Sequence, residues 1–366
     1  MLRLPDAPPS LREDPSNRLG LDYAAESTRF PKLGYGIVDM HAHINGMDAS
    51  AIWAPIARSY GIEKTFSMTR LEDVPAMRER FGDAIEFITI PDWHHADKRH
   101  GHGTDYLARI EKYRELGTRI VKFWNAPRFI DFGLEAGDKH LLALDGPMRL
   151  EQMRLAERLG MICMTHVADP DTWFAAKYTD RDKYGAKLDH YAPLRRALDR
   201  FGMPWIAAHM GGFPEDLGFL DRLLESHPNL HLDTSATKWM VRELGRHSRD
   251  EIVSFLEKWR GRILFGTDTV TTDEHLREGD KSSEMGKKAT SREGANDLYA
   301  SRYWALRMMW EGSGEVASPI ADPDLAMVAP DRHGPLDGPP LRGLALPPDL
   351  LRVLYRDAAL ALLAKA

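Results

Sequence analysis

Side chains that can bind a metal ion follow five separate apolar segments of this chain. They are His41 and His43 in IVDMHAHI, His166 in MICMTHVAD, His209 in WIAAHMGG, Asp268 in ILFGTDT and Lys122 in RIVKFW. A short apolar run that ends in a polar residue is typical of a buried parallel strand, and active-site residues lie at the carboxyl ends of such strands. The recurrence predicts that several strands end around one ion.

From Ile37 onward, short β-rich runs alternate with amphipathic helical stretches. The predicted strands are 37–43, 63–69, 85–92, 119–125, 161–168, 205–210, 230–236 and 263–269. Eight strands that alternate with helices predict an α/β fold closed into a (β/α)8 TIM barrel, with long loops on its carboxyl-terminal face. An open doubly wound sheet is the structural alternative, but it would carry a glycine-rich phosphate turn after an early strand, and none follows 37–44.

The barrel is predicted over residues 37–311 and is the metal-dependent part of the chain. The segments before and after it are interpreted as additions to the barrel, with an N-terminal arm over residues 1–36. Residues 312–366 predict a Pro- and Gly-rich excursion over 312–346 and a closing C-terminal helix over 348–365, both within the same domain.

Two long insertions follow predicted strand ends and are rich in aromatic residues. Because they fall on the rim where barrel active sites form, we expect 126–146 and 169–193 to wall the site. The polar stretch 270–296 is predicted to be mobile. A helix is predicted over 214–227, with Pro214 in its first turn.

Composition limits the class of partner and the compartment. The formal net charge of −6 argues against nucleic acid or an anionic membrane as the main partner. No apolar run approaches the ~20 residues that span a bilayer, and the amino terminus has no signal-peptide core. The single cysteine, Cys163, excludes an internal disulfide framework. We expect a soluble, cytoplasmic protein that acts on a small molecule.

The spacing of four of these residues favours a catalytic metal site. Residues two apart on a strand face the same side, so His41 and His43 can both reach an ion at ~2.0–2.1 Å. Asp268 ends an apolar strand, where a buried carboxylate needs a cation as its partner. With His166, the set offers three nitrogens and one oxygen and leaves space for water, as catalytic sites do.

His209 and Lys122 each have more than one interpretation. His209 could bind a second metal ion or act as a general acid/base, and the glycines that follow it allow close backbone approach and lead into a helix whose positive end would favour an anion. A buried Lys122 could lose its proton and take up carbon dioxide, and the resulting carbamate would bridge two ions. Alternatively, Lys122 holds a substrate carboxylate or pairs with an acid without a chemical role.

The motifs VDMHAHI, THVAD, AHMGG, HPNLHLDTSA and LFGTDT, in this order and spacing, resemble the amidohydrolase superfamily. The resemblance is to its amidohydrolase-related branch, which includes aminocarboxymuconate-semialdehyde decarboxylase, several aromatic-acid decarboxylases and true hydrolases. It covers about residues 37–270. The excursion has no counterpart in the branch, and Arg356-Asp357-Ala358 stands where the closing helix often has Gly-Asn-Ala.

The resemblance implies a role for each candidate. By this resemblance, the metal ligands, usually for zinc, would be His41, His43, His166 and Asp268. His209 would be catalytic in a mononuclear enzyme or a ligand in a binuclear one, and Lys122 occupies the position of a carbamylated bridge. Asp233 lies in a structural strand of the branch and is not assigned to the metal. Barrels of this branch are often dimers, so a homodimer is a further expectation.

Three functions follow from these residues. The first is a metal-dependent hydrolase with one or two ions, in which Asp268 and His209 handle protons and Trp124 and Arg128 of FWNAPR bind a carboxylate-bearing substrate. The second is a non-oxidative decarboxylase of an aromatic or unsaturated acid on the same ligands. The third, a binding protein with a degenerate site, is disfavoured because every ligand position holds a competent residue. The sequence names no substrate.

Overall fold

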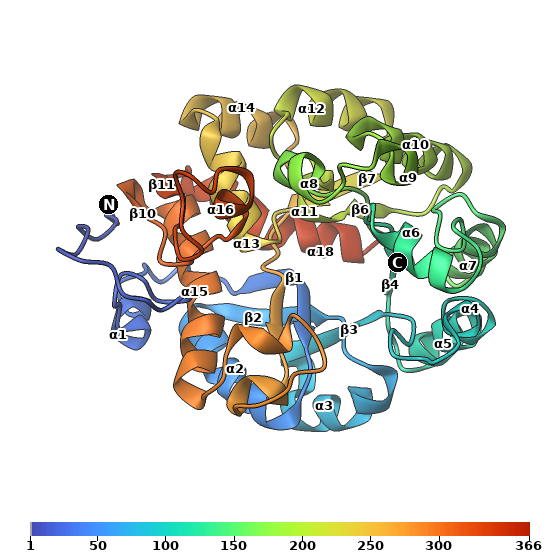
Figure 1. Ribbon diagram of the computed structural model, residues 1–366, viewed down its shortest axis with the longest axis horizontal. Helices are drawn as coiled ribbons and strands as arrows, with labels where there is room; N and C mark the ends of the chain where they lie inside the picture. The colour runs from blue at the N-terminus through green and yellow to red at the C-terminus, as the bar shows by residue number, and fades with distance from the viewer. Residues whose placement is uncertain (1) are drawn as a thin grey trace.

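The computed structural model describes residues 2–366 and consists of a parallel β-barrel surrounded by helices (Figure 1). Over these residues one sheet has the strand order β8-β7-β6-β5-β4-β3-β2-β1-β9. Its strands are β1 (Ile37–Ile44), β2 (Ile62–Ser67), β3 (Ile85–Thr89), β4 (Ile120–Trp124), β5 (Ile162–His166), β6 (Trp205–Ala207), β7 (Leu230–Asp233), β8 (Ile263–Leu264) and β9 (Thr269–Thr271).

The eighth barrel strand consists of two pieces, β8 and β9, and their pairing with β7 and β1 closes the sheet. β8 pairs in parallel with β7, and β9 pairs in parallel with β1. Between the pieces, the backbone N–H of Met40 in β1 donates to the carbonyl of Phe265 at 2.9 Å. The predicted eight-stranded barrel is confirmed. The strand predicted at 263–269 is interrupted over 265–268, and within this break Asp268 adopts a φ of 58°.

Helices cover the outside of the barrel (Figure 1). In the first half they are α1 (Tyr23–Ser27), α2 (Met47–Ser59), α3 (Val74–Phe81), α4 (Lys98–His102), α5 (Thr104–Glu115), α6 (Phe129–Glu135), α7 (Pro147–Arg158), α8 (Asp171–Ala176) and α9 (Arg181–Tyr184). In the second half they are α10 (Tyr191–Arg200), α11 (Ala208–Gly211), α12 (Leu217–Ser226), α13 (Thr237–Arg242), α14 (Arg249–Lys258), α15 (Arg292–Glu311), α16 (Asp324–Val328), α17 (Pro348–Arg352) and α18 (Ala358–Leu363).

Short turns complete the chain. The 3₁₀ turns are η1 (Leu71–Asp73), η2 (Gly82–Ala84), η3 (Lys187–His190), η4 (Leu244–Arg246), η5 (Asp273–Leu276) and η6 (Gly286–Lys288). A π-helical turn, η7 (Val353–Asp357), joins α17 to α18, so that the predicted closing helix is continuous. None of the helices within residues 2–366 has the length and apolarity that a membrane crossing requires.

The helix predicted over 214–227 begins three residues later than expected. The carboxylate of Asp216 accepts the backbone N–H of Phe219 at 2.8 Å and caps α12, which starts at Leu217. Since a capping side chain satisfies the free N–H groups of the first turn, the helix starts after the cap, and Pro214 lies outside it.

Two predicted appendages are built into the outer layer. The N-terminal arm contains α1 and packs against α15, with Tyr23 buried and Glu26 accepting the indole N–H of Trp304 at 2.9 Å. In the segment 270–296, His275 of η5 is fully buried and contacts the hydroxyl of Tyr299 at 2.9 Å, and the mobility of the whole segment stays a prediction.

The Pro- and Gly-rich excursion has secondary structure of its own. It pairs β10 (Ser313–Ala317) with β11 (Pro340–Leu344) in an antiparallel two-stranded sheet and carries α16 between them. α16 packs against α8, which belongs to the loop that follows β5 (Figure 1). The excursion therefore reaches the carboxyl-terminal rim of the barrel.

Candidate metal centre

The predicted site residues lie at the carboxyl ends of their strands, at one end of the barrel. His41 and His43 are in β1, Lys122 is in β4, His166 ends β5, His209 follows β6, and Asp268 lies between β8 and β9. The side chains of His41, Lys122, His166 and His209 are all buried. The topology that brings them together is the one the sequence predicted.

Three donor atoms meet on the side of the centre that solvent reaches. His43 Nε2 lies 3.2 Å and His41 Nε2 lies 3.6 Å from Oδ1 of Asp268. The side chains of His43 and Asp268 are 35% and 21% exposed, whereas that of His41 is 1% exposed. Two imidazoles and one carboxylate at these separations fit a first-row divalent ion, with room left for water.

Asp233 orients His41 for this role. The carboxylate of Asp233 is fully buried, and Oδ2 accepts a hydrogen bond from Nδ1 of His41 at 2.8 Å. Burial acts to raise the pKa of Asp233, but the contacts with His41 outweigh it and hold the pKa well below its ordinary value. A carboxylate on Nδ1 leaves Nε2 of His41 unprotonated and directed at the ion site, as outer partners of metal-binding histidines do.

A second group of possible ligands, formed by His41, His209 and Asp233, has a different character. All three residues are buried, and Asp233 already accepts bonds from His41 and from the backbone N–H of His209, the latter at 2.9 Å. A closed, internally hydrogen-bonded group leaves no position for substrate or water. We therefore assign it to the support of the first group.

His209 is held as a neutral imidazole. The hydroxyl of Ser235 donates to Oδ1 of Asp233, so it accepts the hydrogen bond from Nδ1 of His209 at 2.7 Å. Burial, with the neighbouring rings of His41 and His166, lowers the pKa of His209 well below its ordinary value. Its Nε2 is then left with a free lone pair, which suits a proton acceptor.

His166 is placed beside His209 rather than within the group of three donors. The ring centroids of the two histidines are 4.9 Å apart, and Nε2 of His166 contacts Oδ1 of Asp169 at 2.9 Å. Of the two candidate groups found within residues 2–366, neither includes His166. Its role as a ligand stays a prediction, and it would act through Nδ1 with Asp169 as its outer carboxylate.

Lys122 points into the barrel, toward His41. Its Nζ lies 3.5 Å from Nε2 of His41, and the side chain is buried. Burial lowers the pKa of Lys122 to about 8, against the opposing charges of Asp233 and Asp268. The neutral amine is the nucleophile that attacks carbon dioxide, and a lowered pKa favours the neutral amine. The carbamate interpretation therefore stays open beside the other two.

Asp268 stays ionised at the mouth of the site. Burial acts to raise its pKa, but the hydrogen bond with His43 and the charges of His41 and Lys122 outweigh burial and lower the pKa to about 2. A carboxylate so stabilised is an anionic ligand rather than a strong base on its own.

The backbone is strained around the same residues. Of the five non-glycine residues with positive φ within 2–366, four are His209, Met210, Ala236 and Asp268, all at the ends of strands six to eight. Left-handed backbone at such residues costs about 1–3 kcal/mol each and is concentrated at functional sites. The strain is an indicator of function that is independent of the side-chain contacts.

At the glycines after His209, the backbone lies close to that of the segment after β5. A Cβ on Gly212 would lie 2.1 Å from the carbonyl oxygen of Ala168, so no side chain fits there. The expected helix N-terminus for an anion is not formed at this point, because α11 is a left-handed turn and α12 begins only at Leu217.

Trp124 and Arg128 follow each other closely at the end of β4, and their side chains have different surroundings. The half-buried ring of Trp124 packs edge-on against Trp93 and Phe132, with centroids 5.7 Å and 5.2 Å away. Arg128 is exposed and immediately precedes α6. Substrate binding by this pair stays a prediction.

Four residues support the site without having been predicted to do so, namely Asp169, Asp233, Ser235 and Trp239. Asp233 ends β7 in the same way that the predicted ligands end their strands, so the strand-end rule could have found it. Asp169 follows His166 by three residues. The ring of Trp239, 5.3 Å from that of His209, comes from α13 and has no local signal.

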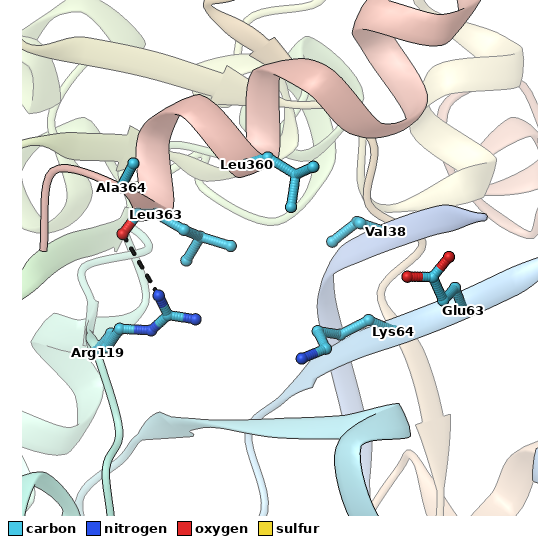
Figure 2. Close-up of a pocket in the computed structure, with 7 residues that line it drawn as sticks. All are labelled: Val38, Glu63, Lys64, Arg119, Leu360, Leu363 and Ala364. Atoms are coloured by element: carbon cyan, nitrogen blue, oxygen red, sulfur yellow. Dashed lines mark hydrogen bonds between the residues drawn. The ribbon is translucent and has the colours of Figure 1, made fainter. Parts of the chain in front are cut away.

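A surface cavity lies at the other end of the barrel. Figure 2 shows its lining residues, among them Lys64, Arg119 and Leu363, from the starts of β2 and β4 and from α18. Its volume is about 340 Å³. Active sites of this barrel type lie at the carboxyl-terminal face, so we do not place the site in this cavity.

Residues 38–364 match the family model described as amidohydrolase. The chain belongs to the amidohydrolase family. The match extends beyond the 37–270 covered by the motifs and includes the excursion. The members of this family are metal-dependent enzymes, which agrees with the donor set at the mouth of the barrel.

Solved structures similar to this amidohydrolase-family protein share little sequence with it. An uncharacterised TIM-barrel protein from Bordetella bronchiseptica is 14% identical, with 90% of this chain and 99% of that chain covered and a TM-score of 0.48. A probable 2-pyrone-4,6-dicarboxylic acid hydrolase from Acinetobacter baumannii is 13% identical over 73% and 92%, with a TM-score of 0.43. A 2,6-dihydroxybenzoate decarboxylase from Rhizobium is 13% identical over 72% and 98%, with a TM-score of 0.43. Among curated proteins, none matches the chain.

Proposed function

We propose that this protein is a metal-dependent hydrolase that cleaves an amide, ester or lactone bond of a small, carboxylate-bearing molecule. The observation that carries the proposal is the approach of His41, His43 and Asp268 on the solvent-reached side of the centre. We propose zinc as the ion, held by these residues together with His166, with a second ion if Lys122 is carbamylated.

A divalent cation at this site would supply Lewis-acid chemistry, that is, the activation of water and the polarisation of a carbonyl group. Nitrogen and carboxylate donors of this kind suit zinc. The outer carboxylate Asp233 keeps His41 in the tautomer that a metal ligand needs.

The protein's own residues would move the protons. His209 is neutral and presents an unprotonated Nε2, so it can accept the proton of the attacking water and deliver it to the leaving group. Asp268 accepts a hydrogen bond from the same water and orients it. Because His209 and Asp268 both have strained backbones, we propose that their positions are fixed before substrate binds.

A decarboxylase is the second candidate, and Lys122 is the observation that favours it. The Nζ of Lys122 faces the centre 3.5 Å from His41, where an ammonium group could hold a substrate carboxylate. In that reaction a protonated acid would transfer a proton to the carbon that loses carbon dioxide. The substrate would be an aromatic or unsaturated acid and a single ion would suffice.

Metal analysis and product analysis test the proposal. Elemental analysis gives the number of ions per chain, and intact mass shows whether Lys122 carries a carbamate. Esters, lactones and amides of aromatic acids are then compared with the free acids. Hydrolysis products without release of carbon dioxide support the hydrolase, and carbon dioxide from the free acids supports the decarboxylase. A purified protein that binds no divalent ion contradicts both.

A further inference from the structure

The excursion between β10 and β11 is joined to the barrel by a buried ionic cluster. Oδ2 of Asp324, the first residue of α16, accepts a hydrogen bond from Nη2 of Arg242 at 3.1 Å. Arg242 lies at the end of α13 and also donates to Asp322 and, at 3.1 Å, to the hydroxyl of Thr172. Asp322, Asp324 and Arg242 are all buried. This is more than a surface contact, since buried charges persist only when they are paired.

Asp324 also holds a tryptophan of the loop that follows β5. Its Oδ2 accepts the indole N–H of Trp173 in α8 at 2.8 Å. The ring of Trp173 is half-buried, and this hydrogen bond to a buried carboxylate restrains both the position and the rotation of the ring. α16 and α8 pack against each other (Figure 1).

From Trp173 the contacts continue to the metal centre. Its ring packs edge-on against Trp239, with the centroids 5.8 Å apart. Trp239 in turn packs edge-on against His209 at 5.3 Å and against His166 at 6.1 Å. Two residues therefore separate Asp324 from the imidazoles of the centre.

The segment that carries Trp173 reaches His166 by a second route. The backbone N–H of Tyr178 donates to the carbonyl of Trp173 at 2.9 Å, and the Tyr178 hydroxyl donates to Oδ2 of Asp169 at 2.5 Å. Oδ1 of Asp169 is the partner of Nε2 of His166. Two separate series of contacts thus link Trp173 to His166.

We propose that Asp324 is a positioning residue for the metal centre, which acts through Trp173 to fix the rings of His166 and His209. The proposal rests on the proposed function in one respect, namely that His166 binds the ion. The proposal gives the excursion a role in the active site, because a residue that follows the barrel strands in the chain would hold the histidines of the centre in place.

Zinc affinity tests the proposal without a substrate. The dissociation constant for Zn²⁺ is measured by competition with a chromophoric chelator for the wild-type protein, Asp324→Ala and Trp173→Phe. We expect both variants to bind zinc more weakly by up to about 10-fold, which is less than the loss of a direct partner of a ligand causes, because Asp324 and Trp173 act through intervening residues. Asp324→Asn keeps an oxygen for the indole N–H and should restore most of the affinity.

A double variant separates positioning from general stability. If Asp324 acts through the indole N–H, Asp324→Ala should weaken zinc binding no further in a Trp173→Phe background. The imidazole ¹⁵N shifts of His166 and His209 in the metal-free protein should also change in both single variants. Glu315→Ala is the matched control, because Glu315 is an acid of the same excursion that pairs with Arg342 at 2.7 Å on the surface.

The outcomes are distinguishable. A wild-type protein that does not bind zinc contradicts the proposed function. Wild-type binding with unchanged affinity and unchanged imidazole shifts in Asp324→Ala overturns the positioning role. If Asp324→Ala fails to fold, Trp173→Phe decides, because it removes the N–H donor and leaves the ion pairs of Asp324 and Asp322 with Arg242 in place; wild-type affinity in this variant also overturns the proposal.

Discussion

Nδ1 of His41 donates to the buried carboxylate of Asp233 at 2.8 Å, and this contact determines which nitrogen of His41 can bind an ion. The carboxylate also accepts the backbone N–H of His209. One side chain at the end of β7 thus holds a residue of β1 and the left-handed turn after β6 in a fixed relationship.

Asp233→Asn should weaken metal binding by about 10-fold to 100-fold, because the outer partner sets the tautomer and basicity of His41. Chelator competition measures the loss. His333 and Asp337 provide the control, since they form a His–Asp pair at 3.3 Å on the surface. Asp337→Asn should leave metal binding unchanged, and an equal loss in both variants would show that the effect is not specific to the centre.

His166→Ala should lose metal and activity together, whereas His209→Ala should keep the metal and lose turnover if one ion is bound. The reason is that His209 is predicted to move protons and His166 to bind the ion. Elemental analysis of both purified variants, with activity, gives the answer. Loss of metal in His209→Ala would instead indicate two ions.

Lys122→Met should stabilise the metal-free protein at pH 7. Burial lowers the pKa of Lys122 from 10.5 to about 8, so the folded state binds the proton less tightly than the unfolded state. Below pH 8 Lys122 is protonated in both the folded and the unfolded state. Burial of its charge then lowers the free energy of unfolding by its full amount, about 3 kcal/mol at most. The cost falls as the pH rises from 8 to 10.5.

Denaturant unfolding of the EDTA-treated proteins at pH 7 and pH 10 measures this dependence. The stability gained by Lys122→Met should be smaller at pH 10 than at pH 7. The exposed Lys139 offers a control, Lys139→Met, with little change at either pH. A gain that does not depend on pH would mean that packing, and not the buried charge, is responsible.

Gly212→Ala should destabilise the protein more than Gly117→Ala. Both glycines have positive φ, 74° and 85°, so each substitution carries the left-handed cost of about 1–2 kcal/mol. A Cβ on Gly212 also meets the backbone of Ala168, whereas one on Gly117 meets nothing within 4 Å. The free energy of unfolding measures the difference, and equal losses would show that the backbone at Ala168 moves away freely.

The strand-end pattern predicted the barrel, and it predicted correctly which segments end at the same rim. It succeeded because residues two apart on a strand share a face, and parallel strands end on the same side of the sheet. His41, His43 and Lys122 point inward by this local rule alone. The boundary of α12 was missed because Asp216 competes with Pro214 as the start of the helix.

The sequence by itself determined the fold class and the type of chemistry, because strand parity and the choice of imidazole or carboxylate are written in a few adjacent residues. Only the tertiary structure decided that Asp233 holds His41, that Asp169 occupies Nε2 of His166, and that Asp324 reaches the centre through Trp173. These contacts join segments from different strands and loops. Their geometry depends on how the loops pack on the closed barrel, and no periodicity within one segment encodes it.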